Sequence, residues 1–251
     1  MKIYEDNLHR MAYATDASAY REKPAAVAYP ETEDDIRTLI GMARERHTCL
    51  IPRAGGTSIA GQVVGSGIVA DISRHWNRIL EINGEERWAL VQPGVVRDEL
   101  NIALKPYGLF FSPETSTSNR CCIGGMVGNN SCGTHSLIFG STRHHVIGLR
   151  AVLADGTVIY ANRDHTEYDA GSQLANGIMH ILQSWRNDTE TRQLIQDAFP
   201  DASLQRRSCG YTLDECLYGE GINLCALLTG SEGTLAVSKD AALDGVAVKF
   251  T

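Results

Sequence analysis

Glycine is concentrated in three short segments of this chain, and these segments constrain the fold more than any other feature. Twenty-four of the 251 residues are glycine, which is about one in ten against roughly 7% in average proteins. The segments are residues 52–61 (PRAGGTSIAG), 122–133 (CIGGMVGNNSCG) and 230–235 (GSEGTL). Because glycine has no Cβ, backbone at these positions can turn sharply and approach a ligand or another segment closely. The positions of these glycines are therefore the starting point for predicting a ligand site.

The first segment has the composition of an anion-binding loop. Consecutive small residues allow backbone N–H groups to converge on a phosphate, and the hydroxyls of Thr57 and Ser58 add further donors. The segment has neither the GK[ST] ending of a P-loop nor a G-x-G-x-x-G dinucleotide fingerprint. A tight turn between two strands would explain the same residues, so this loop alone leaves both interpretations open.

The second segment is longer than a structural turn requires. Gly124, Gly125, Gly128 and Gly133 are interleaved with Asn and Ser, which predicts a glycine-rich loop that passes close to a flat ligand and bonds its polar edge. The third segment, residues 230–235, indicates by itself only a turn beside a strand.

The hydrophobic pattern predicts short strands that alternate with helices. Thr32 and Asp35 form a capping box ahead of apolar residues at helical spacing, and Ala154-Asp155-Gly156 is a strong hairpin signal. Hairpins argue against a purely parallel sheet, so we expect an α+β fold of two lobes with a boundary near Gln92. The predicted helices cover 32–46, 96–105, 178–185 and 191–199, and the predicted strands cover 49–52, 67–71, 78–82, 88–92, 147–153, 157–160 and 225–228.

Charge and composition exclude several classes of protein. The formal net charge is −7 and there is no basic run, which argues against a nucleic-acid partner because phosphate binding relies on clustered positive charge. No stretch approaches the roughly 18 apolar residues of a membrane span, and the N-terminus lacks the apolar region of a secretory signal. Seven cysteines occur without a C-x-x-C pair, so we expect reduced packing thiols in a cytoplasmic protein.

The order of the motifs resembles a known flavoprotein family. FGSTR at 139–143 and VLADGT at 152–157 lie between the second and third glycine-rich segments. Together these motifs resemble the FAD-binding domain of the vanillyl-alcohol oxidase/p-cresol methylhydroxylase (PCMH-type) family, over about residues 24–236. RRSCGYTL at 206–213 makes the chain most similar to the D-lactate, glycolate and D-2-hydroxyglutarate dehydrogenase branch.

The resemblance implies a PCMH-type fold of two α+β lobes with FAD in the cleft between them. It divides the chain into an N-terminal arm, 1–23, and an FAD-binding domain, 24–251, whose lobes cover about 24–92 and 93–251. The first segment would hold the pyrophosphate, and residues 113–133 would line the ring and ribityl chain. The implied cofactor-binding residues are Pro52, Arg53, Ala54, Gly55, Gly56, Thr57, Ser58, Gly61, Gln62, Pro113, Glu114, Ser116, Cys122, Ile123, Gly124, Gly125, Asn129, Asn130, Cys132, Gly133, Glu232, Gly233 and Val237.

Two departures from the wider family shape the expected function. Members that attach FAD covalently through the first loop carry His where this chain has Thr57, so we expect dissociable FAD. A substrate-binding cap domain normally follows the last FAD motif, whereas this sequence stops at Thr251. We therefore expect the cap to be absent and the chain to be a fragment or a truncated gene product, inactive alone.

The resemblance implies oxidation of a D-2-hydroxyacid by hydride transfer to flavin N5. The substrate would bind through the absent cap, with a redox partner or iron–sulfur domain outside this chain and peripheral membrane placement as an alternative for the full enzyme. The sequence identifies neither a catalytic residue nor a metal site, since the adjacent His144 and His145 do not converge. A reductase similar to the UDP-N-acetylenolpyruvoylglucosamine reductases and a non-catalytic flavin-binding module are the alternatives.

Overall fold

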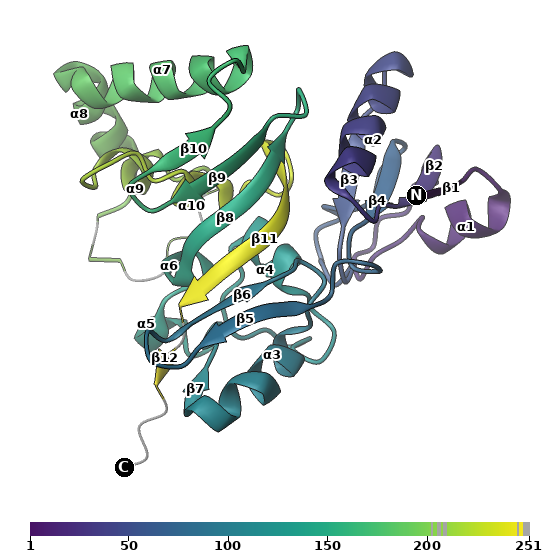
Figure 1. The fold of residues 1–251 in the computed structure, drawn as a ribbon, viewed down its shortest axis with the longest axis horizontal. Coiled ribbons are helices and arrows are strands. Elements are labelled where there is room, and N and C mark those ends of the chain that lie inside the picture. Colours follow the sequence, from purple (N-terminus) through teal and green to yellow (C-terminus); the bar gives the residue numbers. More distant parts are fainter. Residues whose placement is uncertain (202, 205–206, 208–209, 245, 248–251) are drawn as a thin grey trace.

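The chain forms two β-sheets with helices packed around them (Figure 1). The computed structural model describes residues 1–201, 203–204, 207, 210–244 and 246–247. Within these residues, no helix combines the length and apolar character needed to cross a bilayer. Helices and sheets are mixed as the sequence predicts, which confirms the α+β fold class.

The first sheet has four strands and lies toward the N-terminal end of the chain (Figure 1). Its order is β1-β2-β4-β3, in which β2, β4 and β3 are parallel and β1 is antiparallel to β2. The segment predicted as an N-terminal arm thus contributes an edge strand and the short helix α1 to this lobe. The bounds are β1 Lys2–Tyr4, α1 Asn7–Ala12, β2 Ala26–Tyr29, β3 Leu50–Arg53 and β4 Ile68–Asp71.

Helix α2 (Glu33–Glu45) connects β2 to β3 and begins at the predicted capping box. The Asp35 backbone N–H donates to Thr32 Oγ1 at 3.2 Å, and the Thr32 N–H donates to the Asp35 carboxylate at 3.0 Å. The side chains of Ile36, Leu39 and Ala43 are buried along one face. Local capping and an apolar stripe therefore fix both the start and the orientation of this helix.

The second sheet has six antiparallel strands in the order β10-β9-β8-β11-β6-β5. The predicted hairpin at residues 154–156 is confirmed as the β8–β9 turn, where Gly156 has a φ of +87°. The strand bounds are β5 Ile79–Asn83, β6 Trp88–Val91, β8 Val146–Leu153, β9 Val158–Asn162, β10 Thr166–Tyr168 and β11 Ala236–Asp244.

Helices and a small two-stranded sheet surround the six-stranded sheet (Figure 1). The helices are α3 Arg97–Leu104, the 3₁₀ turn η1 Lys105–Tyr107, α4 Ile123–Asn129, α5 Ser136–Phe139, α6 Thr142–His145, α7 Gln173–Asn187, α8 Thr189–Ala198, α9 Leu213–Leu217 and α10 Leu224–Leu228. The small sheet pairs β7 (Leu109–Phe110) with β12 (Val246–Ala247).

Two predicted elements were wrong. Residues 225–228, predicted as a strand, lie in α10, because the Asn223 side chain accepts a hydrogen bond from the Ala226 N–H at 3.1 Å and starts a helical turn. The second glycine-rich segment, predicted as a loop, begins with helix α4, whose Ile123, Met126 and Val127 are buried. In both places tertiary packing and capping override a short and ambiguous local pattern.

Helix α2 holds the two sheets together. The Arg37 Nε donates to Gly156 O at 2.9 Å and an Arg44 nitrogen donates to Ala154 O at 3.0 Å. Beside these bonds, the Glu33 carboxylate accepts from Arg150 on β8 at 2.7 Å. An apolar cluster fills the same interface with Ile36, Ile72, Trp76, Val152 and Val237.

The chain passes from the first sheet to the second between Asp71 and Ile79. β5 and β6 are hydrogen-bonded into the six-stranded sheet. We therefore propose this connecting segment as the boundary between the lobes, in place of the predicted boundary near Gln92.

Candidate cofactor site

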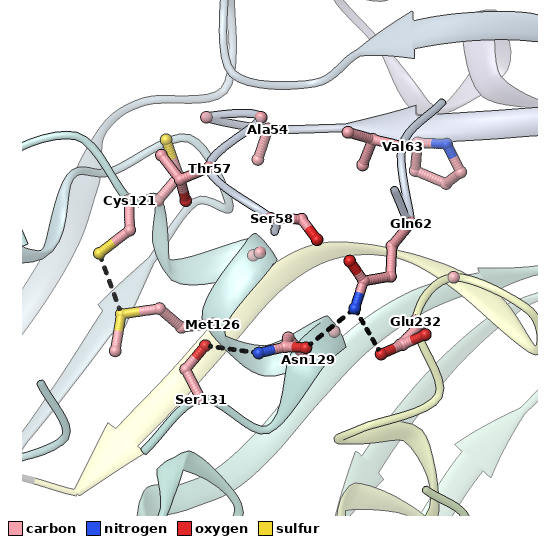
Figure 2. Close-up of a pocket in the computed structure, with 18 of the residues that line it drawn as sticks. Ala54, Thr57, Ser58, Gln62, Val63, Cys121, Met126, Asn129, Ser131 and Glu232 are labelled. Carbon is pink, nitrogen blue, oxygen red and sulfur yellow. Dashed lines mark hydrogen bonds between the residues drawn. The ribbon is translucent and has the colours of Figure 1, made fainter. Parts of the chain in front are cut away.

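A cavity of about 320 Å³ lies where the two lobes meet. The first lobe contributes the loop after β3, and the second contributes α4, the end of α10 and the start of β11 (Figure 2). Sites for small molecules and cofactors are commonly clefts of about 300–1,000 Å³ at such junctions. The cavity is therefore the best candidate for a ligand site among the described residues.

Most of the residues predicted to bind a cofactor line this one cavity, although they come from three separate parts of the sequence. The predicted residues that line it are Pro52, Ala54, Gly55, Gly56, Thr57, Ser58, Gln62, Ser116, Cys122, Gly124, Gly125, Asn129, Glu232, Gly233 and Val237. The fold thus brings the three glycine-rich segments to one place.

The other predicted residues do not line the cavity and instead support the segments that do. These residues are Arg53, Gly61, Pro113, Glu114, Ile123, Asn130, Cys132 and Gly133. Ile123 is fully buried in the core, and the Asn130 side-chain oxygen accepts from the Arg143 N–H at 2.9 Å. The Glu114 carboxylate bonds Thr134 and His135; the hydrogen bond from the Thr134 hydroxyl is the main cause that lowers the pKa of Glu114.

Arg53, which is predicted to bind the cofactor, does not line the cavity and packs against Tyr13. Its guanidinium carbon lies 5.2 Å from the centroid of the Tyr13 ring, and one of its nitrogens donates to Tyr13 O at 3.4 Å. A Cβ added to Gly56 would lie 2.6 Å from another guanidinium nitrogen. The side chain therefore packs against the Gly56 turn without lining the cavity.

At Gly55 and Gly56 the first-lobe wall has no room for side chains. A Cβ on Gly55 would lie 2.6 Å from the Arg120 carbonyl oxygen, and Gly56 has a φ of +60°. Side chains at these two positions would clash or strain the chain. The glycines let this loop fold tightly against the 120–122 segment, with Thr57 and Ser58 at the cavity (Figure 2).

The second-lobe wall is the glycine-bearing face of α4. Gly124 packs on Pro93, where an added Cβ would meet the proline Cβ at 2.4 Å. In contrast, a Cβ on Gly125 or Gly128 would have no neighbour closer than 3.9 Å among the residues that the structure describes. These two glycines leave open space beside the helix, so the wall is shaped to admit a ligand against its backbone.

A string of polar side chains joins the two walls (Figure 2). The Gln62 Nε2 donates to Glu232 Oε1 at 3.0 Å and is 3.4 Å from Asn129 Oδ1. Asn129 in turn donates to Ser131 Oγ at 3.3 Å. The Gln62 Oε1 is buried and has no hydrogen-bond partner among the described residues, which leaves one acceptor for a ligand donor.

Two cysteines, Cys121 and Cys122, line the cavity. Burial raises the pKa of the Cys122 thiol to about 12, and burial is also the main cause that raises the pKa of Cys121. The Thr115 hydroxyl is 3.1 Å from the Cys121 sulfur. Both groups are protonated at neutral pH and serve there as small packing side chains.

Several lining residues were not identified from the sequence. Some lie inside predicted segments without having been selected, while Ala17 and Ile72 carry no motif. These residues are Ala17, Ile59, Val63, Ile72, Thr115, Thr117, Cys121, Met126, Gly128, Ser131, Leu228, Ser231, Ala236 and Ser238. Among the described residues, no group of three or more His, Cys, Asp or Glu side chains is arranged to hold a metal ion. Arg206, Ser208 and Cys209 of the RRSCGYTL motif lie outside the described residues.

A cavity between two α+β lobes whose walls are glycine-rich backbone is suited to a phosphate-bearing ligand, because backbone N–H groups can converge on an anion there. A family model described as "FAD binding domain" matches residues 24–162, and the chain belongs to this family. FAD is the cofactor of the domain. The residues of the cavity fit FAD, because Gly125 and Gly128 leave space along α4. In addition, the buried Gln62 Oε1 has no hydrogen-bond partner among the described residues.

The chain is similar to part of several larger proteins. It is 41% identical to the D-2-hydroxyglutarate dehydrogenase of Escherichia coli (strain K12), over 94% of this chain and 24% of that protein. It is 34% identical to the glycolate oxidase subunit GlcD of Bacillus subtilis (strain 168), over 70% of this chain and 40% of that protein. The chain thus spans about a quarter of the length of its D-2-hydroxyglutarate dehydrogenase relative.

A solved structure of alkyldihydroxyacetonephosphate synthase has the same fold. The two structures align with a TM-score of 0.67 and 19% identity, over 99% of this chain and 38% of the other. This similarity confirms the fold predicted from the motifs.

Proposed function

We propose that this chain is the FAD-binding part of an FAD-linked dehydrogenase that oxidises a D-2-hydroxyacid of the lactate, glycolate or 2-hydroxyglutarate class. The observation that carries the proposal is a 41% identity to a D-2-hydroxyglutarate dehydrogenase over 94% of this chain. Bound flavin would supply the chemistry by accepting a hydride at N5.

The residues of this chain would bind and orient the cofactor. Backbone N–H groups of the loop at residues 54–58 would bind the pyrophosphate, with Arg53 supplying positive charge from behind the Gly56 turn. Residues 113–133 would lie along the ring and ribityl chain. Thr57 has no nucleophilic nitrogen, so the attachment would be non-covalent.

Substrate recognition would come from outside this chain. Glu232 is the one charged side chain that lines the cavity among the described residues, and a carboxylate repels the carboxylate of a hydroxyacid. The cations that hold the substrate and the base that takes its hydroxyl proton would therefore be supplied by a cap domain. The redox partner, an iron–sulfur domain and a cytoplasmic location also stay predictions.

The proposal is tested by adding FAD to the purified chain and following flavin fluorescence together with thermal unfolding. We expect saturable binding, release of free FAD after denaturation, and a raised unfolding temperature. The longer polypeptide that carries this chain should then reduce an artificial dye with D-2-hydroxyglutarate, glycolate or D-lactate. Reduction by NADPH with reoxidation by a nucleotide sugar would contradict the dehydrogenase proposal, and no saturable FAD binding would contradict the cofactor site.

A further inference from the structure

A second pocket, of about 110 Å³, lies where α7 and α10 pack on the β8–β9–β10 end of the six-stranded sheet (Figure 1). Its lining comes from these five elements and from the residue before β11. It shares one lining residue, Leu228, with the cofactor cavity and is otherwise separate from it. No part of the proposed function uses this pocket, so its lining must indicate what it binds.

The lining of this second pocket is apolar almost throughout. Nine of its eleven residues are Ala, Ile, Leu or Met, and within the described part of the chain none is charged. Thr166 and Tyr168 supply the two hydroxyls, and the backbone of both residues is paired with β9. The Thr166 Oγ1 is buried and bonds no other described residue. Because a buried water needs about two to four polar partners, this lining favours an apolar occupant over water.

The pocket reaches the surface of the protein through apolar side chains. Leu153 and Ile159 are at most 4% exposed, whereas Ile178 on α7 is half-buried. Leu174 and Ile181 lie on the same face of α7 as Ile178, at helical spacing, and their exposed fractions are 37% and 48%. An apolar surface on α7 therefore continues into the apolar interior of the pocket.

We propose that this pocket binds the end of an aliphatic chain, and that the exposed apolar side chains of α7 contact the part of the ligand that remains outside. The site is distinct from the proposed cofactor site and does not depend on it. An engineered cavity of about 150 Å³ lined by Leu, Ile and Phe stays dry and binds benzene or xenon. The second pocket has a comparable volume and lining.

Straight-chain alcohols from propanol to octanol test the proposal by calorimetric titration of the purified chain. Each CH₂ group that becomes buried should tighten binding about fourfold, equivalent to about 0.8 kcal/mol. The gain per CH₂ group should fall once the chain fills the pocket. No saturable binding of any alcohol, or equal affinity for all of them, would overturn the proposal.

Two substitutions place the binding in this pocket. Ala175 is 3% exposed and lines the pocket from α7, so Ala175→Leu should fill part of the space and raise the Kd for hexanol tenfold or more. Ala198→Leu is the matched control, because Ala198 is exposed at the end of α8 and its substitution should leave that Kd unchanged. An unchanged Kd in Ala175→Leu would overturn the proposal.

Thr166→Val tests the same site without a change of volume. Replacing a buried hydroxyl that has no described partner by a methyl group should raise the unfolding temperature. It should also keep or tighten hexanol binding, and weaker binding would overturn the apolar site. This variant decides the question if Ala175→Leu does not fold, which thermal unfolding of each variant shows.

An aliphatic chain has two sources, a free small molecule and a membrane lipid. Sedimentation of the wild-type chain with phosphatidylcholine vesicles, lost in Ala175→Leu, assigns the site to a lipid. Hexanol binding without sedimentation assigns it to a small molecule. Titration with FAD keeps the two sites distinguishable: a chain that binds FAD but no alcohol overturns this inference alone, and a chain that binds alcohols but no FAD overturns the cofactor site alone.

Discussion

The two walls of the cavity are both rich in glycine, yet the glycines have different structural roles in them. In the first-lobe wall, Gly55 and Gly56 allow close backbone packing, because an added Cβ would meet the Arg120 carbonyl at 2.6 Å or the Arg53 guanidinium at the same distance. In the second-lobe wall, Gly125 and Gly128 keep space open for a ligand, since the nearest described neighbour of an added Cβ would lie 3.9 Å away.

This difference separates stability from affinity. Substitutions in the first-lobe wall should lower the free energy of unfolding, whereas substitutions in the second-lobe wall should weaken cofactor binding. Residues that join the walls should fall between these extremes. The predictions below test that separation in order of decreasing effect.

Gly55→Ala is expected to cause the largest loss of stability. The new Cβ would meet a backbone carbonyl oxygen at 2.6 Å and the Cys122 sulfur at 3.4 Å, and overpacking of this kind costs about 1–3 kcal/mol. The free energy of unfolding, measured with urea, should fall by about that amount. Gly41→Ala in α2 is the control: nothing lies within 4 Å of its added Cβ, so stability should rise by about 0.5–1 kcal/mol. Equal effects at the two positions would contradict the packing role of Gly55.

Gly125→Ala should leave the fold intact and weaken FAD binding. Within the described part of the chain the added methyl group contacts only Ala54 outside its own helix, at 3.9 Å, and alanine favours the helix, so the cofactor-free chain should be slightly more stable. The methyl group would occupy space along the cavity, and we expect a rise in the FAD Kd of about tenfold, equivalent to about 1.4 kcal/mol. An unchanged Kd measured by fluorescence titration would show that FAD does not lie along α4.

Glu33→Gln should lower the free energy of unfolding by about 1 kcal/mol, because it removes the carboxylate that joins the two lobes. The Glu33 side chain is 15% exposed and lies 2.7 Å from an Arg150 nitrogen and 3.5 Å from Lys239 Nζ. The loss should appear in urea unfolding and shrink at high salt. Asp34→Asn is the matched control, because the side chain of Asp34 is 84% exposed and, among the described residues, pairs only with Arg37 on the same helix. A larger loss at Asp34 would contradict the role of Glu33.

The smallest effect concerns pH. Burial raises the pKa of Cys122 to about 12, whereas an unfolded thiol ionises near pH 8.5. The folded state therefore favours the protonated thiol, and this stability is complete below about pH 8.5 and is lost as the pH rises toward 12. Between pH 7 and pH 9 we expect Cys122 to account for less than about 1 kcal/mol of the loss. Cys122→Ala should reduce the loss of unfolding free energy between pH 7 and pH 9 by that amount. An unchanged pH dependence of urea unfolding would contradict the burial of the Cys122 thiol.

Local signals predicted part of this fold well. The Thr32–Asp35 capping box and the Gly156 turn act within a few residues, so the sequence around them is sufficient. Helix α4 was missed because three glycines in seven residues have poor helix propensity. Its helix is stabilised by burial of Ile123, Met126 and Val127 and by close packing of Gly124 on Pro93, which no short window contains.

The same limit applies to the site. Motifs predicted the residues whose own backbone forms the walls, such as Gly55 and Gly125. They did not separate lining residues from their supports, as Arg53 and Glu114 show, because the direction of a side chain depends on distant partners such as Tyr13 and Thr134. Ile72 and Ala17 line the cavity although neither lies in a motif.

The position of β11 in the second sheet has a consequence for how the chain folds. β11 lies between β8 and β6, and its residues pair with Val152 and Ala89 far earlier in the sequence. The β5–β6 and β8–β9–β10 hairpins can form from local contacts, but they become one sheet when β11 inserts between them. Because such distant pairings form slowly, we expect the wall that includes Val237 and Ser238 to be completed late in folding, and the cofactor site to form after most of the secondary structure.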